Sequence, residues 1–217
     1  LRTGDENAWP HLPHITALAA LAALLHDLGK ATQAFQDKLK NPGLRERNHY
    51  RHEWVSVRLF QAFVGQDDDA GWLQRLADCA APGTDAKAFE ALWLDHASGR
   101  LLRDGLDEPQ AQQRLPFAHL PPLAQAVAWL VFTHHRLPCM PVKQAQGIDT
   151  DGLEDNTHTH RRFGARPSFI NTSDLEDVLL RISADWNEPR ESVPVATRAA
   201  HWHFPHGLPV TQPAWRQ

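Results

Sequence analysis

Apolar residues recur at three- and four-residue spacing along much of the chain, which is typical of helices with one buried face. The segment 15–28 has leucines three or four residues apart and alanine on most other faces, so it predicts a helix buried nearly all round. No segment carries a convincing strand pattern. The spacing predicts helices at 15–28, 34–39, 52–64, 69–80, 84–97, 121–134 and from 173 to about 187. The chain is therefore predicted to be all-α.

Local signals mark where the helical pattern stops. Gly29 is predicted to end the first helix as its C′ residue, with Lys30 beside the negative end of the helix dipole. Residues 138–171 form a long irregular stretch rich in Pro, Gly, Asp, Thr and His, and a loop of that length is usually functional or disordered. Residues 191–217 are Pro-rich without periodicity, which predicts a linker or tail.

Composition limits the class of protein. The 217 residues are 42% hydrophobic, enough for a sizeable core, and the net charge of −4 excludes a basic surface over the whole molecule. Binding of a phosphate polymer would then need a local groove or bound cations. Cys79 and Cys139 are too few for a disulfide scaffold, and the polar residues 1–10 show no signal peptide. No apolar run reaches membrane-spanning length by this pattern, so we expect a cytoplasmic protein without a membrane partner.

Four short motifs carry the candidate chemistry: LLHDLGK at 24–30, RHE at 51–53, THH at 133–135 and SAD at 183–185. Imidazole and carboxylate groups hold catalytic divalent cations while leaving coordination positions open. The candidate metal ligands in these motifs are His26, Asp27, His52, His134, His135 and Asp185.

Position in the helices strengthens this interpretation. Asp185 follows Ile182 by three residues, and His134 follows Leu130 by four and Val127 by seven, so each lies on an apolar face. His52 precedes Val55 and Leu59 with the same spacing. A buried, unpaired carboxylate costs several kcal/mol, and a bound cation cluster would compensate all of these groups together.

The His26–Asp27 pair favours two ions over one. Adjacent helical residues point about 100° apart, so the pair cannot easily chelate a single ion. Asp27 can instead bridge two ions through its two oxygens while His26 binds one of them. This arrangement suits a two-metal centre, with ions about 3.5–4 Å apart, that clamps a phosphoryl group and makes hydroxide from water.

The order His-Asp, His, His-His, Asp on successive helices resembles the HD phosphohydrolase superfamily. LLHDLGKATQAFQ, RHEWVS and HHRLP resemble the HD nuclease domain of the CRISPR type I helicase–nuclease, and AWLVFTHHRLP is most similar to its type I-F branch. The resemblance covers about residues 12–190. It implies an all-α HD-domain helical bundle over residues 1–190, followed at 191–217 by a Pro-rich linker or tail towards a helicase domain.

The resemblance also implies roles for single residues. His26 would bind the first ion, Asp27 would bridge, and Asp185 would complete the first ion's shell; His52, His134 and His135 would hold the second ion. Asp27 and Lys30 are the expected catalytic residues, with Lys30 neutralising the scissile phosphate; a solvated lysine at a helix end is its alternative. The expected substrate-binding residues are Ser56, Arg136, Arg161 and Arg162. The family usually has a further upstream histidine, for which His14 lies too far from His26, roughly 18 Å along one helix.

The function implied is a metal-dependent single-stranded DNA nuclease in CRISPR interference, an antiviral defence, with DNA supplied by a helicase module in the same polypeptide. Two divalent ions are expected, with Mn, Fe, Co or Ni favoured and Mg or Zn as alternatives. The CRISPR surveillance complex and adaptation proteins are the expected protein partners. One alternative is an HD phosphohydrolase of nucleotides or cyclic dinucleotides. The other is a non-enzymatic helical interaction module with an incomplete metal site.

Overall fold

The computed structural model describes residues 9–43, 50–107, 119–135 and 194–216. Within these ranges the regular elements are helices and no strand is present, so the prediction of an all-α fold is confirmed. The elements are α1 (Leu12–Leu25), η1 (Leu28–Ala31), α2 (Gln33–Lys40), α3 (His52–Val64), α4 (Asp69–Asp78), α5 (Ala86–Leu94), α6 (Pro122–Thr133), α9 (Val195–Ala200), η5 (Pro209–Thr211) and α10 (Pro213–Arg216). The predicted loop 138–171 and the predicted helix from 173 lie outside the described residues.

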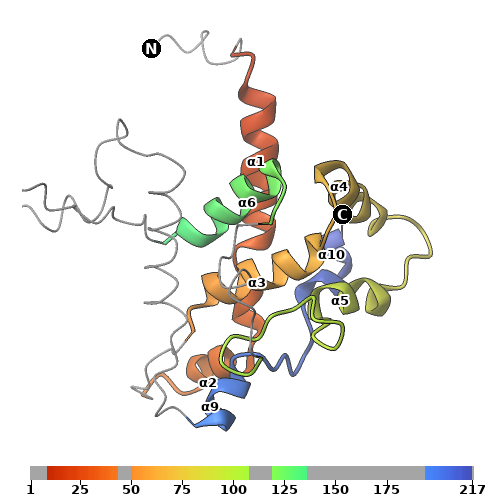
Figure 1. Cartoon of the computed structure of the whole chain (residues 1–217). Coiled ribbons are helices and arrows are strands. Elements are labelled where there is room, and N and C mark those ends of the chain that lie inside the picture. The colour runs from red at the N-terminus through yellow and green to blue at the C-terminus, as the bar shows by residue number, and fades with distance from the viewer. Residues whose placement is uncertain (1–8, 44–49, 108–118, 136–193, 217) are drawn as a thin grey trace, which may run out of the picture.

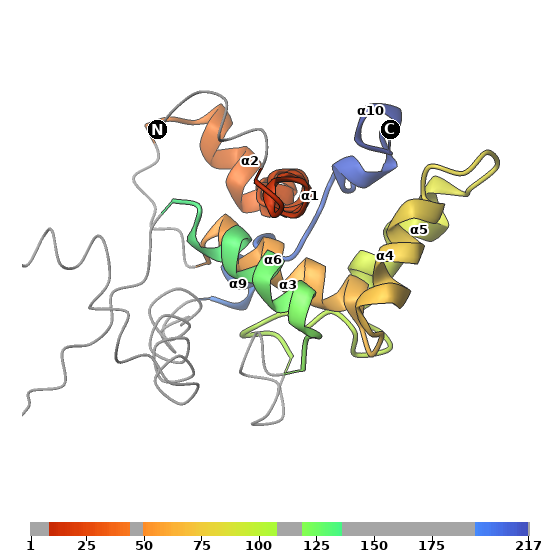
Figure 2. The ribbon, with the colours of Figure 1, turned by 90° about the horizontal axis from the view of Figure 1, so that it is seen from above.

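Helix α3 is the centre of the molecule. All of its residues except His52 and Gln61 are buried, because the helix packs against η1, α6 and α5 on different sides. Figures 1 and 2 show α6 lying against α3 and α1 against α6, with α2 at one end of α3 and the α4–α5 pair at the other. A helix surrounded in this way can hold a polar group at its exposed end in a fixed position, and that end carries His52.

A buried ion pair fixes the start of α3. Two nitrogens of the Arg58 guanidinium donate to the Asp104 carboxylate at 2.9 and 2.8 Å, and Trp54 Nε1 donates to the same carboxylate at 2.6 Å. The Asp104 backbone carbonyl accepts from the Tyr50 hydroxyl and from Trp202 Nε1. Because every charge in this network is paired inside the core, it joins the first turns of α3 to the segment 101–107 and to the C-terminal segment.

Helix α1 departs from the prediction of burial nearly all round. It ends at Leu25, which is the one fully buried residue of the helix, whereas Leu12 and Ile15 remain 37% and 44% exposed. The N-terminal turns extend beyond the other described helices, so they have no described partner on most faces (Figure 1). An apolar sequence predicts a tendency to be buried, but neighbouring elements decide how many faces are covered.

The stretch from Leu12 to Ala31 is long and apolar enough to cross a membrane by length and composition, with a mean hydropathy of 1.3. This differs from the expectation that no run reaches that length. Core helices of soluble proteins pass the same test, and this stretch ends in His26, Asp27 and Lys30, which take part in the polar cluster described below. The stretch therefore gives no indication by itself of a membrane protein.

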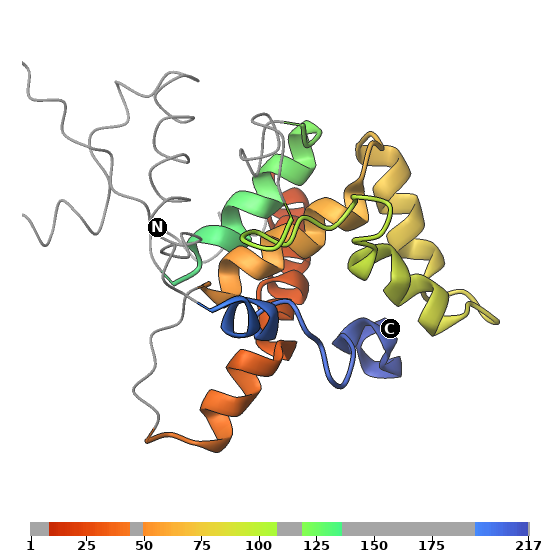
Figure 3. The ribbon, with the colours of Figure 1, turned by 60° about the horizontal axis from the view of Figure 1, so that its bottom comes forward.

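The C-terminal segment packs into the domain. Trp202, Leu208 and Val210 are buried in the core. Helix α9 contacts α2 and η5 contacts α5, and Figure 3 shows the segment running from α9 near α2 to α10 on the side of α5. The Glu90 carboxylate accepts the Leu208 backbone N–H, and a Cβ at Gly207 would lie 2.2 Å from that carboxylate. The described residues 194–216, expected to be a linker or tail, thus form part of the core; a helicase domain beyond them stays a prediction.

Candidate metal centre

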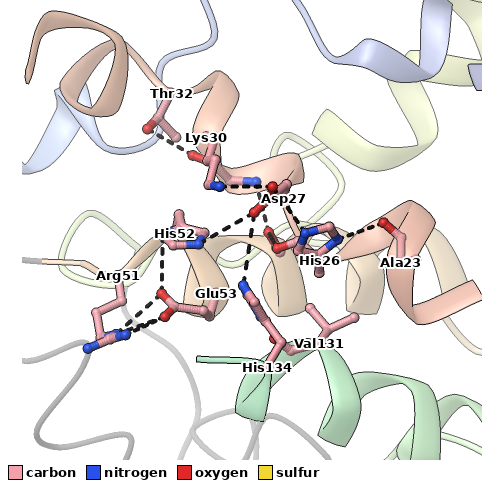
Figure 4. A network of polar contacts seen from close by, with 12 residues as sticks. Ala23, His26, Asp27, Lys30, Thr32, Arg51, His52, Glu53, Val131 and His134 are labelled. Atoms are coloured by element: carbon pink, nitrogen blue, oxygen red, sulfur yellow. Dashed lines mark hydrogen bonds and ion pairs between the residues drawn. The ribbon is translucent and has the colours of Figure 1, made fainter. Parts of the chain in front are cut away.

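Five predicted ligands converge at one end of the helical bundle. His26 caps the C-terminus of α1, Asp27 starts the turn into η1, His52 is the first residue of α3, and His134 and His135 follow the end of α6. Figure 4 shows Asp27 in the middle with His26, His52 and His134 directed towards it. The remaining predicted ligand, Asp185, and the predicted substrate-binding residues Arg136, Arg161 and Arg162 lie outside the described residues.

The two carboxylate oxygens of Asp27 face different groups. Oδ2 lies 3.1 Å from His26 Nε2 and 2.8 Å from Lys30 Nζ. Oδ1 lies 3.5 Å from His52 Nε2 and 4.0 Å from His134 Nε2. A carboxylate with one oxygen towards each of two imidazole sets has the shape needed to bridge two cations.

Two overlapping groups of side chains have the spacing of metal ligands. His52, His134 and His135 form one group, and His26, Asp27 and His134 form the other; in each group the ligand atoms lie within 4.8 Å of one another. The first group is the histidine triad that the family resemblance implies for the second ion. The second group contains His26 and Asp27, the two predicted ligands of the first ion that lie within the described residues. His14 is exposed on α1 and belongs to neither group.

Two buried atoms at the centre have no hydrogen-bond partner within the described ranges: Asp27 Oδ1 and His52 Nε2. Burying a polar atom without a partner costs about 1–3 kcal/mol in proteins, so this pair is unfavourable as it stands. Both are acceptors when Asp27 is ionised and His52 is neutral with its proton on Nδ1. A cation beside them would satisfy both at once, and the donor set of imidazoles and a carboxylate fits a divalent transition metal.

Backbone carbonyls at helix ends orient two of the imidazoles. His26 Nδ1 lies 2.6 Å from the Ala23 carbonyl oxygen, and His134 Nδ1 lies 2.6 Å from the Val131 carbonyl oxygen. The last carbonyls of a helix lack intrahelical partners and are available to accept. An Nδ1–H donated to a carbonyl leaves the Nε2 lone pair directed at Asp27, which is how proteins commonly hold a metal-binding histidine.

The electrostatics favour the metal-binding protonation states. Burial is the largest cause that lowers the pKa of His52, to about 4, and burial also lowers the pKa of His134 below its ordinary value. For Asp27, burial would raise the pKa, but the hydrogen bond from Lys30 and the charges of His26, Lys30 and His52 outweigh it and lower the pKa. At neutral pH the centre therefore presents neutral imidazoles at His52 and His134 and an ionised carboxylate at Asp27.

We expect the stability of the metal-free chain to fall on acidification through the histidine range. The folded pKa of His52, about 4, lies below its ordinary value of 6.5, so the unfolded chain takes up this proton first as the pH falls. The contribution is complete above about pH 6.5 and is lost towards pH 4. It is at most about 3.5 kcal/mol at about 1.4 kcal/mol per pKa unit. Urea unfolding at several pH values measures it, and a His52→Gln variant with an unchanged pH slope would contradict it.

Ser56 and Gly29 hold the η1 turn against α3. The Ser56 hydroxyl accepts the Gly29 N–H at 2.8 Å and donates to the His26 carbonyl at 2.9 Å, and its side chain is buried. Ser56 was expected to bind substrate, but in the structure it bonds two backbone groups and faces the core. A Cβ at Gly29 would lie 2.1 Å from the His52 carbonyl oxygen. Glycine is therefore needed for this close approach, and not as the end of α1, which stops at Leu25.

Glu53 is a polar residue of the centre that the sequence did not single out. It is fully buried beside His52, with Oε2 lying 3.3 Å from His52 Nδ1, and it pairs with Arg51. The RHE motif places three polar residues next to one another at a helix start, and the middle one is a candidate ligand. This adjacency was the one sequence feature that pointed to Glu53. It did not predict that the Glu53 side chain is the buried one.

Comparison with known proteins shows that the chain is similar over its whole length to members of one family. A family model described as "Cas3, HD domain" matches residues 7–208. The "CRISPR-associated nuclease/helicase Cas3 subtype I-F/YPEST" of Pseudomonas aeruginosa is 40% identical over 219 residues, covering 100% of this chain and 16% of the relative. The protein of the same description from Pectobacterium atrosepticum is 35% identical over 217 residues, covering 100% and 17%. The chain thus spans about a sixth of the length of these relatives.

Proposed function

Because the chain belongs to the Cas3 HD-domain family, we propose that it is a metal-dependent deoxyribonuclease that hydrolyses single-stranded DNA in CRISPR interference. The resemblance to the type I-F helicase–nuclease is confirmed. The observation that carries the proposal is the convergence of three imidazoles, from His26, His52 and His134, on the Asp27 carboxylate, with His135 grouped beside His52 and His134. Asp27 Oδ1 and His52 Nε2 are buried there without a hydrogen-bond partner among the described residues. A cluster that needs a cation and lies partly open to solvent is suited to phosphodiester hydrolysis.

The residues of the centre divide the work between them. Divalent cations, when bound, would generate hydroxide from water and stabilise the negative charge that develops on the phosphate. Asp27 would bridge two ions, His26 would bind the first and His52, His134 and His135 the second, with Asp185 as a further ligand of the first. Lys30, whose Nζ is paired with Asp27 and whose side chain is 36% exposed, would neutralise the scissile phosphate.

The ligand chemistry favours particular ions. Imidazole nitrogen suits Mn, Fe, Co and Ni better than it suits Mg, which prefers oxygen ligands and keeps its water. Zn remains the alternative among imidazole-binding ions. The described part of the centre offers four imidazoles and one carboxylate, and this ratio supports the transition metals.

The rest of the polypeptide supports the choice of substrate. The relatives are described as nuclease/helicase proteins, and the chain spans about a sixth of their length, so a helicase module in the same polypeptide would feed single-stranded DNA to this centre. Arg136, Arg161 and Arg162 would contact that DNA. Residues 1–190 would form most of the nuclease domain, and residues 191–217, of which 194–216 pack into it, would lead on to the helicase. The CRISPR surveillance complex and adaptation proteins would be its partners in the cytoplasm.

Hydrolysis assays on the purified chain test the proposal. We expect Mn²⁺ to support cleavage of single-stranded DNA, chelation by EDTA to abolish it, and added Mn²⁺, Co²⁺ or Ni²⁺ to restore it, because the proposed nucleophile is hydroxide formed from metal-bound water. Nucleoside phosphates and cyclic dinucleotides are assayed in parallel. Cleavage of those compounds without cleavage of DNA would instead indicate a phosphohydrolase of small substrates. A chain that binds no ion after reconstitution would indicate a non-enzymatic module.

A further inference from the structure

Glu53 lies behind His52, on the side away from Asp27. The Glu53 carboxylate is fully buried, and its Oε2 lies 3.3 Å from His52 Nδ1, while His52 Nε2 faces Asp27 Oδ1 at 3.5 Å (Figure 4). His26 and His134 direct the corresponding Nδ1 at neutral backbone carbonyls. His52 is thus held between two carboxylates, one on each ring nitrogen.

An arginine pairs with the buried Glu53 carboxylate. Arg51 Nε donates to Glu53 Oε1 at 3.2 Å and to Oε2 at 3.3 Å, and Arg51 Nη2 donates to Oε1. Glu53 also lies in the first turn of α3, where the positive end of the helix dipole stabilises an anion. A permanent negative charge therefore faces His52 Nδ1.

A carboxylate in that position has a defined effect on a metal ligand. It accepts the Nδ1 proton, which fixes the tautomer and leaves the lone pair on Nε2, and it makes that nitrogen a stronger donor to a cation. Carboxylate–histidine–metal arrangements typically lose about 10- to 100-fold in metal affinity when the carboxylate is removed. Burial of Glu53 limits the freedom of the ring, so His52 Nε2 is held towards the centre before an ion arrives.

We propose that Glu53 is a positioning residue for one ion of the centre, the ion held by His52, His134 and His135. This inference rests on the proposed metal-dependent function. His52 belongs to that ligand group and not to the group of His26, Asp27 and His134. Loss of Glu53 therefore weakens the binding of one ion and leaves the binding of the other unchanged.

Calorimetric titration of the metal-free chain with Mn²⁺ tests the proposal. The unmodified chain binds two ions, and Glu53→Gln, which keeps the volume and an acceptor oxygen but removes the charge, weakens one of them about 10- to 100-fold. The matched control is Glu90→Gln. Glu90 is also a buried carboxylate, 6% exposed, but it accepts the Leu208 N–H away from the centre. This variant loses thermal stability and keeps both ion affinities.

Each outcome separates the two ideas. An unmodified chain that binds no Mn²⁺ overturns the proposed function. An unmodified chain that binds two ions, with a Glu53→Gln variant that binds both equally well, overturns only the role of Glu53. An equal loss of affinity for both ions, together with a lower melting temperature, shows that Glu53 only supports the fold. This outcome also overturns the proposal.

A second measurement needs no variant of Glu53. Nitrogen-15 NMR of the imidazoles in the metal-free chain at neutral pH reports which ring nitrogen of His52 carries the proton, with His52→Gln used to assign the signal. We expect the proton on Nδ1, facing Glu53, and a bare Nε2. A proton on Nε2 overturns the proposal even where Glu53→Gln fails to fold.

Discussion

Replacing Asp27 by asparagine is expected to lower the rate of DNA hydrolysis by at least about 10³-fold. Asp27 is the one described carboxylate with an oxygen towards each set of imidazoles, at 3.1 Å from His26 and 3.5 Å from His52. Asparagine has nearly the same shape, but it has no negative charge and only one acceptor oxygen. It cannot bridge two cations, so the variant loses at least one of them and the stabilisation of charge on the phosphate.

The measurement is the rate of single-stranded DNA cleavage at saturating Mn²⁺, together with the number of ions bound per chain. Asp37→Asn is the matched control, because Asp37 is a carboxylate on α2 whose described partner is Gln33 and which belongs to neither ligand group. We expect its activity to equal that of the unmodified chain. An Asp27→Asn variant that retains activity within about 10-fold would show that hydrolysis does not depend on a bridging carboxylate.

The convergence of the histidines could be predicted because helical periodicity assigns each residue to a face. His52 precedes Val55 and Leu59, and both of these are buried as expected. The argument for His134 was correct for a partly different reason. Leu130, one of its reference residues, is 36% exposed, whereas Val131, three residues before His134, is fully buried. The apolar face of α6 is thus rotated slightly from the predicted one, and a histidine at its end still reaches the centre.

The contacts between elements could not be predicted, because they depend on how closely two backbones approach. The sequence pattern predicted that Gly29 ends the first helix. In the structure, glycine is required at this position because the His52 carbonyl of α3 lies against it. Ser56 was predicted to bind substrate because it lies one turn from His52. In the structure that turn faces inward, against the His26 and Gly29 backbone. Spacing along one helix predicts the direction in which a side chain points, but it does not predict which element packs there.

The C-terminal segment illustrates a different limit. Periodicity is informative for regular helices, but Trp202, Leu208 and Val210 are buried from short helical turns joined by irregular backbone. Their burial depends on single anchors, such as the Leu208 N–H donated to Glu90 and the Trp215 indole donated to the Leu24 carbonyl of α1. A sequence rich in proline and lacking a repeat gives no indication of such anchors.

Substitution of Gly29 by alanine is expected to disrupt both the fold and the metal centre. The added Cβ would lie 2.1 Å from the His52 carbonyl oxygen and 3.0 Å from the His52 Cα. Both atoms belong to the α3 backbone, so no side-chain rotation can relieve the clash, and η1 must move away from α3. We expect a loss of about 3 kcal/mol or more in the free energy of unfolding, at the upper end of the usual range for overpacking.

The same movement would separate Asp27 from His52, because these residues lie on the two elements that Gly29 holds together. A displacement of 1 Å in a catalytic group can lower a rate about 10²-fold, so activity at saturating Mn²⁺ is expected to fall by at least that factor. Gly43→Ala is the matched control, since a Cβ there meets no atom of the described residues within 4 Å. Urea unfolding and DNA cleavage of both variants give the measurement. Equal stability and activity in the two would mean that the approach of η1 to α3 does not set the geometry of the centre.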